Sequence, residues 1–372
     1  MLIYIMMLLI ITICAMCMYN LKNKQRFFLY FACTILFIVS ALRDVTVGSD
    51  TVSYINTFNF VRDAPISQSL NLYFEKGYII YNYIISRFFS SPQSLLIISS
   101  FITVMLIGRF IYKNSRNAYL SIYLFITLMF YYSSMNTLRQ YIAVSIVVFG
   151  YEYVKERKFI RYLFCIIIAS FFHTTASMAI FIYFLYKLKF SFKKVVLFCV
   201  STLAIYFMFV PLFNFIINLF PRYTSYETRL DSNNLASYIS MVVYILILFL
   251  GLIFRYYNVK EKEGTPKSLR KSNKRNVLEK EESNSKSILT YIILITVLLT
   301  FLSIRLNILA RANIYFSIFS IIYIPNILKE IKDKNLRTLW IYIIVILFGL
   351  YNLIIFLYRP DWHRVVPYNF FF

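Results

Sequence analysis

Polar residues able to bind anions stand in short clusters between long apolar runs. The first cluster directly follows an apolar run and reads Arg43-Asp44-Val45-Thr46-Val47-Gly48-Ser49-Asp50-Thr51, with Tyr54 soon after. It combines an arginine, two carboxylates and several hydroxyls, and Gly48 permits a tight backbone turn among them. Taken alone, an ordinary solvated loop explains this cluster as well as a binding site does.

The second and third clusters each place a cationic or titratable side chain at the edge of an apolar run. Arg139 and Gln140 stand at the start of a predicted helix, where free backbone N–H groups add positive potential. An arginine there suits an anion, although an arginine reaching toward the membrane surface is the alternative. His173 lies between two apolar runs, where an ionisable group is either functional or a hydrogen-bonded structural residue.

The fourth cluster contains Arg305 and Arg311, with no acidic residue in the surrounding apolar sequence. Burying unpaired cations costs several kcal/mol, so an anion from elsewhere should meet them. A diphosphate would serve, and Asp44 or Asp50 are the alternative partners. Together these residues suggest chemistry on an anionic amphiphile, in which arginines hold a diphosphate and a base deprotonates an attacking hydroxyl.

The elements that carry these clusters are predicted to be membrane helices. The 372 residues are 60% hydrophobic and only 15% charged, a balance typical of a chain embedded in a bilayer. Apolar runs near the length that crosses ~30 Å of hydrocarbon predict an all-α polytopic membrane protein. Its single transmembrane domain spans residues 1–372 and has about 12 helices, with 10 or 11 full spans also compatible. The helices are expected at 2–18, 27–42, 93–112, 118–135, 138–154, 159–172, 174–187, 195–218, 236–254, 288–304, 309–328 and 339–357.

The distribution of Lys and Arg predicts how these helices are oriented. Most of the 39 basic residues fall in alternate loops, at 22–26, 109–116, 155–161, 187–194, 255–287 and 329–337. Basic loops face the cytoplasm, so both termini and all four clusters are expected outside. Residues 43–92 then form an outer loop with an amphipathic segment, and residues 255–287 form a basic, flexible cytoplasmic linker.

The same pattern excludes several other classes of protein. The net charge of +23 is spread over every basic loop, which favours contact with membrane lipid over nucleic acid. The five cysteines all lie in apolar runs, and no metal-binding or phosphate-binding motif is present. Neither a metal nor a cofactor is therefore expected.

Several of these motifs resemble the EpsG-like family of bacterial exopolysaccharide polymerases, which is similar to the Wzy polymerases of O-antigen and capsule. The resemblance lies in the Arg-Asp-x-x-Val-Gly-Ser-Asp-Thr stretch, in Leu138-Arg139-Gln140-Tyr-Ile-Ala, in Phe172-His173 and in Arg311 followed by Asn313-Ile-Tyr-Phe. It extends from about residue 40 to the end of the chain, with the basic linker as a gap.

The resemblance implies a multi-pass glycosyltransferase of the bacterial cytoplasmic membrane that joins repeat units carried on undecaprenyl diphosphate. Both donor and acceptor would be such lipid-linked oligosaccharides, and undecaprenyl diphosphate would be released. A flippase and a chain-length regulator are further candidate partners. The implied roles are diphosphate binding by Arg43, Arg139, Arg305 and Arg311, with Gln140 beside them, base catalysis by His173 or by Asp44, and orientation of sugar hydroxyls by Asp50 and Tyr54.

Two other functions fit the same topology. A transporter or flippase of a lipid-linked oligosaccharide would also need arginines, but the 7 Gly and 8 Pro give few of the broken helices on which transporters rely. A membrane acyltransferase that modifies polysaccharide would also use a histidine, but His173 is expected on the side away from a cytoplasmic acyl donor.

Overall fold

A computed structural model describes the chain except for residues 20–23, 189, 210, 212–213, 215–234 and 264–272, and describes only the backbone at 255–263 and 273–286. The described part divides into two compact units, Met1–Ser177 with Ile324–Phe372, and Met178–Tyr323. The prediction that residues 1–372 form a single domain remains a prediction.

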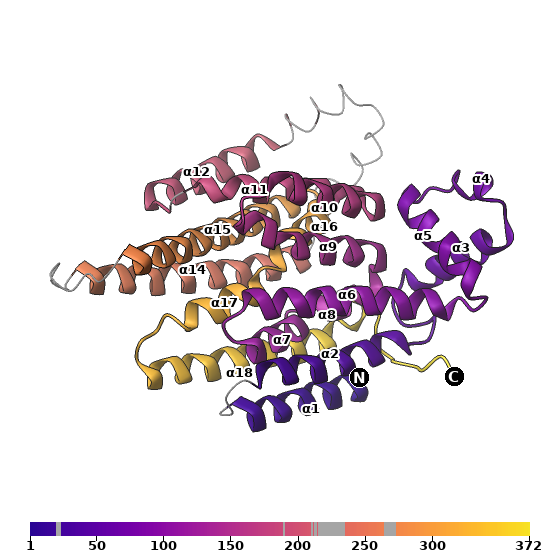
Figure 1. Ribbon diagram of the computed structural model, residues 1–372, viewed down its shortest axis with the longest axis horizontal. Coiled ribbons are helices and arrows are strands. Elements are labelled where there is room, and N and C mark those ends of the chain that lie inside the picture. The colour runs from indigo at the N-terminus through magenta and orange to yellow at the C-terminus, as the bar shows by residue number, and fades with distance from the viewer. Residues whose placement is uncertain (20–23, 189, 210, 212–213, 215–234, 264–272) are drawn as a thin grey trace. The chain divides into compact units, whose positions relative to one another are not determined.

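The first unit is built from helices (Figure 1). They are α1 (Leu2–Tyr19), α2 (Gln25–Ala41), α3 (Thr51–Asp63), α4 (Ile66–Ser69), α5 (Lys76–Phe88), α6 (Gln93–Asn114), α7 (Ala118–Thr127), α8 (Phe130–Asn136), α9 (Leu138–Lys155), α10 (Phe159–Phe172) and α18 (Lys334–Tyr358), with the 3-10 turn η5 (Pro360–Trp362). The 3-10 helix η1 (Thr174–Ile180) and helix α17 (Ser320–Leu328) cross the boundaries between the units.

The second unit contains α11 (Phe181–Phe184), η2 (Leu185–Lys187), α12 (Phe192–Phe207), α14 (Leu235–Glu263), α15 (Asn273–Ser303) and α16 (Ile308–Ser317). Helix α15 packs against α14 and α16. Polar contacts link these helices, because Ser303 Oγ donates to Ser237 Oγ at 2.9 Å and Asn313 Nδ2 donates to Thr300 Oγ1 at 2.7 Å. Helices α14 and α15 extend into the run predicted as a flexible linker, at 255–263 and 273–287.

The described residues of the apolar runs found in the sequence are mostly helical, with breaks at 128–129 and 318–319. The expected helix at 195–218 extends beyond the described residues. By length and composition, four described stretches are able to cross a membrane: Gln93–Asn114, Leu235–Phe254, Ile308–Leu328 and Lys334–Tyr358. A fifth is counted if α7 and α8, which are bent by 53°, form one span. The all-helical class is therefore confirmed, whereas the count of twelve spans is not.

Several apolar helices are shorter than a full crossing. Among those described are Leu2–Met18, Gln25–Ala41, Phe159–Phe172 and Ser287–Ser303. Since about 20 residues are needed to cross the hydrocarbon core, helices of this length span it only where the bilayer or the tilt accommodates them. Hydropathy therefore located the helices but did not decide which ones cross completely.

The core of the first unit is a set of neighbouring helices in the order α2, α6, α9 and α10 (Figure 1). Helix α7 packs against α1, α2 and α18. Beside it, aromatic rings join α1, α8 and α18, with Tyr4 stacked on Phe356 at 5.7 Å and edge-on to Tyr132 at 5.1 Å. These contacts carry the large apolar burial that holds the unit together.

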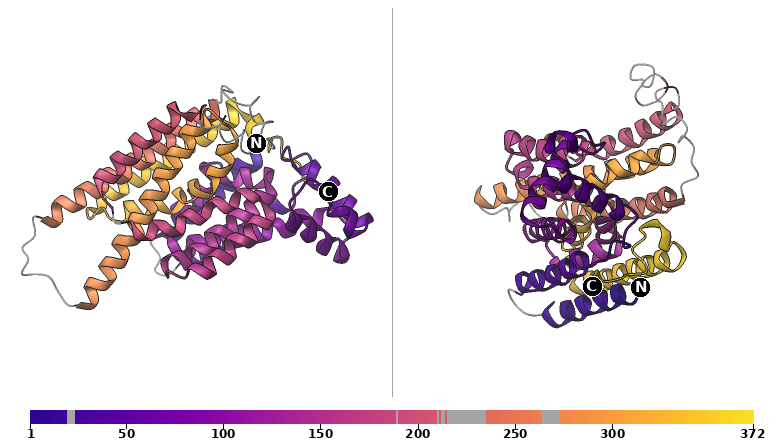
Figure 2. Two further views of the ribbon diagram at one scale, coloured as in Figure 1. Left: turned by 90° about the horizontal axis from the view of Figure 1, so that it is seen from above. Right: turned by 90° about the vertical axis from the view of Figure 1, so that its right-hand side faces the viewer.

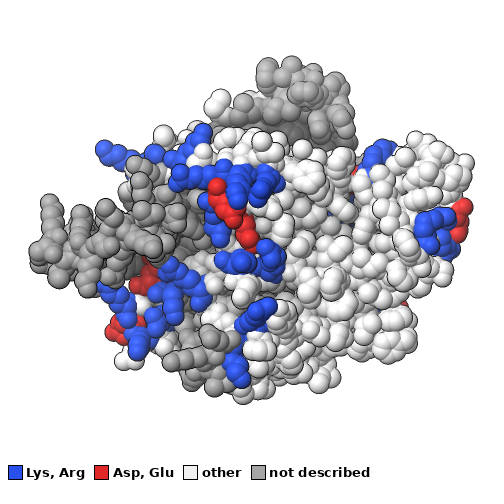
Figure 3. Space-filling view, in the orientation of Figure 1, with Lys and Arg blue, Asp and Glu red and all other residues white. Residues whose placement is uncertain are grey.

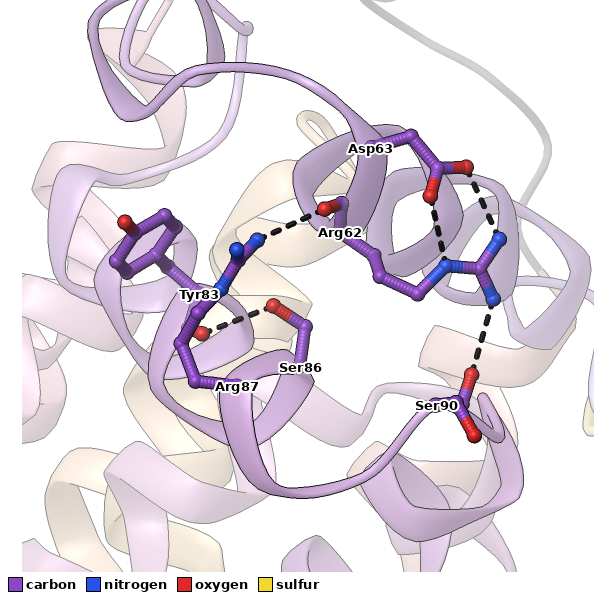
Figure 4. A network of polar contacts seen from close by, with 6 residues as sticks. All are labelled: Arg62, Asp63, Tyr83, Ser86, Arg87 and Ser90. Atoms are coloured by element: carbon purple, nitrogen blue, oxygen red, sulfur yellow. Dashed lines mark hydrogen bonds and ion pairs between the residues drawn. The ribbon is translucent and has the colours of Figure 1, made fainter.

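Helices α3, α4 and α5 form a separate layer at one end of the first unit, as Figure 1 and the left view of Figure 2 show. Polar contacts close this layer (Figure 4): Arg62 pairs with Asp63 at 2.8 Å and donates to Ser90 O at 2.9 Å, and Arg87 donates to Arg62 O at 2.8 Å. Arg87 also lies over the Tyr83 ring at 4.6 Å. The end of α3 is thereby fixed to the end of α5.

Charge is unevenly distributed along the first unit. Lys and Arg gather at the ends of α6, α9 and α10 that lie away from α3 to α5, and a smaller group of both signs lies on the α3 to α5 layer (Figure 3). The surface between them is largely uncharged. Both chain termini lie toward the α3 to α5 end (Figure 1). This asymmetry is the one that the positions of Lys and Arg in the sequence predicted for this part of the chain.

Candidate functional site

Arg43 directly follows α2 and is enclosed by the first unit. Its side chain is only 1% exposed. The guanidinium donates to Ser40 O, to Ser100 Oγ at 3.3 Å and to Met135 O at 3.1 Å. Gln93 Nε2 donates to Arg43 O at 3.1 Å. Arg43 thus joins the ends of α2, α6 and α8, which favours a structural role. Contact with substrate stays a prediction for this residue.

The polar turn after Arg43 packs tightly against the end of α8. Gly48 has φ +93, and a Cβ there would lie 3.1 Å from Met135 O and 3.2 Å from Asn136 Cα. No other residue type adopts this backbone at such close range without strain. Asn136 Oδ1 accepts hydrogen bonds from Asp50 N at 3.1 Å and from Ser49 Oγ at 2.9 Å. The first polar cluster of the sequence therefore packs against the turn that precedes Arg139 and Gln140.

The C-terminal tail covers the same turn. Gly48 N donates to Arg364 O at 2.7 Å, and Asp44 N donates to Asn369 O at 2.9 Å. His363 Nδ1 lies 3.2 Å from Ser133 Oγ, and burial lowers the pKa of His363 to about 4. A histidine held neutral in this way acts here as a packed polar residue.

Asp44, the alternative base, is engaged locally. Its carboxylate accepts hydrogen bonds from the backbone N–H of Thr46 at 2.9 Å and from the Thr46 hydroxyl at 2.8 Å. These bonds lower the pKa of Asp44. Because a carboxylate with a lowered pKa accepts protons poorly, its geometry favours it less than His173 as a base.

Glu75, Arg139 and His173 form a cluster of titratable side chains in the first unit. One carboxylate oxygen of Glu75 accepts from Arg139 Nη1, and the other lies 3.1 Å from His173 Nδ1. The same oxygen accepts from Thr174 N at 3.2 Å. The side chains of Glu75, Arg139 and His173 are 15%, 17% and 13% exposed. Arg139 and His173, which were predicted from the sequence, are therefore brought together by Glu75, which was not predicted.

A glycine makes this arrangement possible. Glu75 immediately precedes α5, and His173 immediately follows α10. A Cβ on Gly77 would lie 2.4 Å from Phe171 Cβ and 2.7 Å from Phe171 O. Only glycine permits the start of α5 to approach the end of α10 so closely, and this approach sets Glu75 against His173.

Aromatic rings surround the guanidinium of Arg139. Its Cζ lies 4.4 Å from the ring centre of Phe74, 5.5 Å from that of Tyr78 and 5.9 Å from that of Tyr54. Arginine stacks well on such rings, and partial exclusion of water strengthens the attraction. Tyr54 is buried on α3, and Gln140 is buried in the first turn of α9. Their predicted roles in binding substrate stay predictions.

Two nitrogen atoms of the cluster have no protein partner within the described part of the chain. They are Arg139 Nε and His173 Nε2, both inaccessible to solvent. If the Glu75 carboxylate accepts the Nδ1 hydrogen of His173, the opposite nitrogen carries the lone pair. The imidazole is then oriented to take a proton at Nε2.

The electrostatics of Glu75 agree with this assignment. Burial raises the pKa of Glu75, but the hydrogen bond from His173 and the positive charge of Arg139 outweigh that effect, so its pKa is lowered overall. The carboxylate therefore stays ionised at neutral pH and is able to hold the imidazole. Glu75 is the only acidic residue between Asp63 and Glu152. The lack of other acidic residues nearby, together with Gly77 two residues later, was the feature of the sequence that could have indicated Glu75 as a site residue.

The remaining predicted arginines belong to the second unit. Arg305 lies over the ring of Tyr206, with Cζ 4.8 Å from the ring centre, and Arg311 is exposed on α16. The prediction that they bind the same diphosphate as Arg139 remains a prediction. Within the described residues, no group of three or more His, Cys, Asp or Glu side chains is arranged to hold a metal ion.

Comparison with known proteins identifies the family. No curated protein and no solved structure matches this chain. A model of the EpsG family matches residues 26–370, nearly the whole chain, and includes α2 to α18 and most of the C-terminal tail. The chain therefore belongs to the EpsG family, a Wzy-like family of exopolysaccharide polymerases.

Proposed function

We propose that this protein joins oligosaccharide repeat units carried on undecaprenyl diphosphate, at the outer face of the bacterial cytoplasmic membrane. The observation that carries the proposal is the cluster of Glu75, Arg139 and His173. It combines a cation for the diphosphate with an oriented base for the acceptor hydroxyl. Family membership supports a polymerase in general, and the cluster supports this particular chemistry.

The orientation follows from charge. In the first unit the cluster lies at the end of α5, α9 and α10 that is remote from the basic ends of α6 and α9. Because basic loops remain in the cytoplasm, the cluster faces outward and both termini lie outside. Repeat units that have been moved across the membrane would reach it there.

In the proposed reaction, His173 Nε2 takes the proton of an acceptor sugar hydroxyl. The oxygen attacks the anomeric carbon of the donor chain and forms the new glycosidic bond. The bond between that carbon and the diphosphate oxygen breaks, and its electron pair leaves with undecaprenyl diphosphate. Base catalysis of this kind contributes about 10²–10⁴-fold in rate. Glu75 keeps the imidazole oriented and stabilises its positive charge after proton transfer.

Arg139 would stabilise the departing diphosphate. One of its N–H groups binds Glu75, and a guanidinium carries five, so others are available for an anion. Arginine binds diphosphate oxygens well because its donors are planar and permanently charged. Arg305 and Arg311 are proposed as further diphosphate ligands from the second unit.

The test uses purified protein in nanodiscs with a lipid-diphosphate oligosaccharide extracted from the source cells. Product length and released undecaprenyl diphosphate are measured together. We expect ladders spaced by one repeat unit, which are lost in Arg139→Ala and Arg311→Ala although both variants insert normally. Arg62→Ala is the matched control, because Arg62 is an arginine of the outer loop held by Asp63 away from the cluster.

The assay also separates the competing functions. Bound but intact substrate, with no diphosphate released, would contradict the polymerase and favour a flippase or transporter. Transfer of an acyl group without chain growth would favour an acyltransferase. Long polymer from both Arg139→Ala and Arg311→Ala would remove these arginines from the site.

A further inference from the structure

A groove lies between α2 and α6 at the basic end of the first unit. It has a volume of about 350 Å³. Its walls include Leu29 and Cys33 from α2 and Met105 and Gly108 from α6. A Cβ on Gly108 would lie 2.6 Å from Cys33 Sγ, so the two helices touch at this point. Much of the lining is therefore apolar, and α2 and α6 are in close contact at Gly108.

Three cations line the same groove. They are Arg26 at the start of α2, and Arg109 and Lys113 in the last turns of α6. No acidic residue is among the described residues that line the groove. Arg109 has one acidic partner outside it, Glu152, at 3.5 Å, and still keeps a side chain that is 48% exposed. The groove therefore carries an excess of positive charge.

Two tyrosines complete the rim. Tyr30 is 60% exposed and accepts hydrogen bonds at 3.3 Å from Nε and Nη2 of Arg26. Tyr112 is 49% exposed, and Lys113 Nζ lies 6.0 Å from its ring centre. Tyrosine and basic side chains of this kind mark the level of lipid headgroups at the edge of a membrane.

We infer that this groove binds an anionic phospholipid, with the headgroup phosphate among Arg26, Arg109 and Lys113 and an acyl chain against Leu29 and Met105. Charge complementarity selects an anion, and basic pockets between membrane helices bind anionic headgroups. The apolar walls select an amphiphile, because a free phosphate would leave them uncovered. This inference concerns a lipid site remote from Glu75 and does not rest on the polymerase reaction.

The first experiment measures lipid retention by native mass spectrometry. The protein is released from nanodiscs that contain equal amounts of phosphatidylglycerol and phosphatidylcholine. We expect the wild type to retain phosphatidylglycerol preferentially. Since each basic residue near a membrane surface contributes about 1 kcal/mol, affinity should fall about fivefold for each charge removed in Arg26→Gln and Lys113→Gln.

The matched control is Arg161→Gln, which removes an exposed arginine in the first turn of α10, outside the groove. It should retain phosphatidylglycerol as the wild type does. Equal retention by the groove variants and by the control would overturn the proposal. Displacement of the lipid by millimolar inorganic phosphate would also overturn it, because the site would then belong to a soluble phosphate compound.

A second measurement places the acyl chain. Met105→Trp puts an indole on the groove wall, and its fluorescence is compared with that of the wild type, which contains two tryptophans. Phosphatidylglycerol brominated in its acyl chains should quench the added signal more strongly than brominated phosphatidylcholine at equal mole fraction. Identical quenching by both lipids would show an ordinary lipid-facing surface and would contradict a specific site.

Discussion

Glu75 Oε1 and His173 Nδ1 lie 3.1 Å apart although 98 positions separate the two residues in the chain. The carboxylate precedes one helix and the imidazole follows another, so neither owes its position to its own local sequence. Their contact fixes which ring nitrogen faces the site. Arg139 on the second carboxylate oxygen holds the same acid ionised.

Replacing Glu75 with Gln should reduce polymer formation while leaving the protein inserted. The amide keeps the size of the side chain but removes the negative charge that stabilises protonated His173. We expect turnover to fall roughly 10–100-fold, less than the 10²–10⁴-fold expected for loss of the base itself in His173→Ala.

Asp63→Asn serves as the control for that experiment, since Asp63 is an exposed acid of the same layer and pairs with Arg62 (Figure 4). It should keep the wild-type rate. A wild-type rate in Glu75→Gln would show that the carboxylate does not act through His173.

Gly77→Ala should disturb the site through packing alone. The added methyl would meet the side chain and backbone of Phe171, and backbone atoms cannot swing away. Overpacking of this kind costs about 1–3 kcal/mol. Thermal stability in detergent should fall and polymer formation should fall with it. Lys76→Ala changes the adjacent exposed residue and should keep both thermal stability and polymer formation. Equal losses in the two variants would argue against close contact at Gly77.

Arg43→Met distinguishes a structural arginine from one that binds substrate. Removing the guanidinium leaves Met135 O without its donor, and an unsatisfied buried carbonyl costs about 1–3 kcal/mol. The melting temperature in detergent should therefore fall, while the apparent affinity for lipid-linked substrate in the surviving protein stays the same. An unchanged melting temperature with weaker substrate binding would restore the diphosphate role predicted from the sequence.

His363 should make stability depend on pH. Its pKa is lowered by burial from 6.5 to about 4, so the folded protein keeps it neutral where the unfolded chain takes up a proton. The unfolded state is favoured increasingly as pH falls from about 6.5 to about 4, and the contribution becomes constant below that. Melting temperatures measured between pH 7 and 4.5 should decline less in His363→Gln than in the wild type. Equal declines would show that His363 is protonated when folded.

The sequence by itself determined the elements and several residues of the candidate site. Hydrophobicity and its run length depend only on neighbouring residues, so the helices at 138–154 and 159–172 were predicted within one residue of α9 and α10. The same local contrast, a charge or imidazole against apolar surroundings, marked Arg139 and His173. The composition of the loops likewise predicted which end of the first unit is basic.

Only the tertiary structure decided what these residues contact. Arg43 looked like an exposed ligand because its sequence neighbours are polar, yet α6 and α8 enclose it. Glu75 was not among the residues predicted from the sequence, and the close approach at Gly77 sets it against His173. Such contacts depend on how helices distant in sequence pack together. Hydropathy reports whether a side chain avoids water, and it contains no information about which partner the side chain meets.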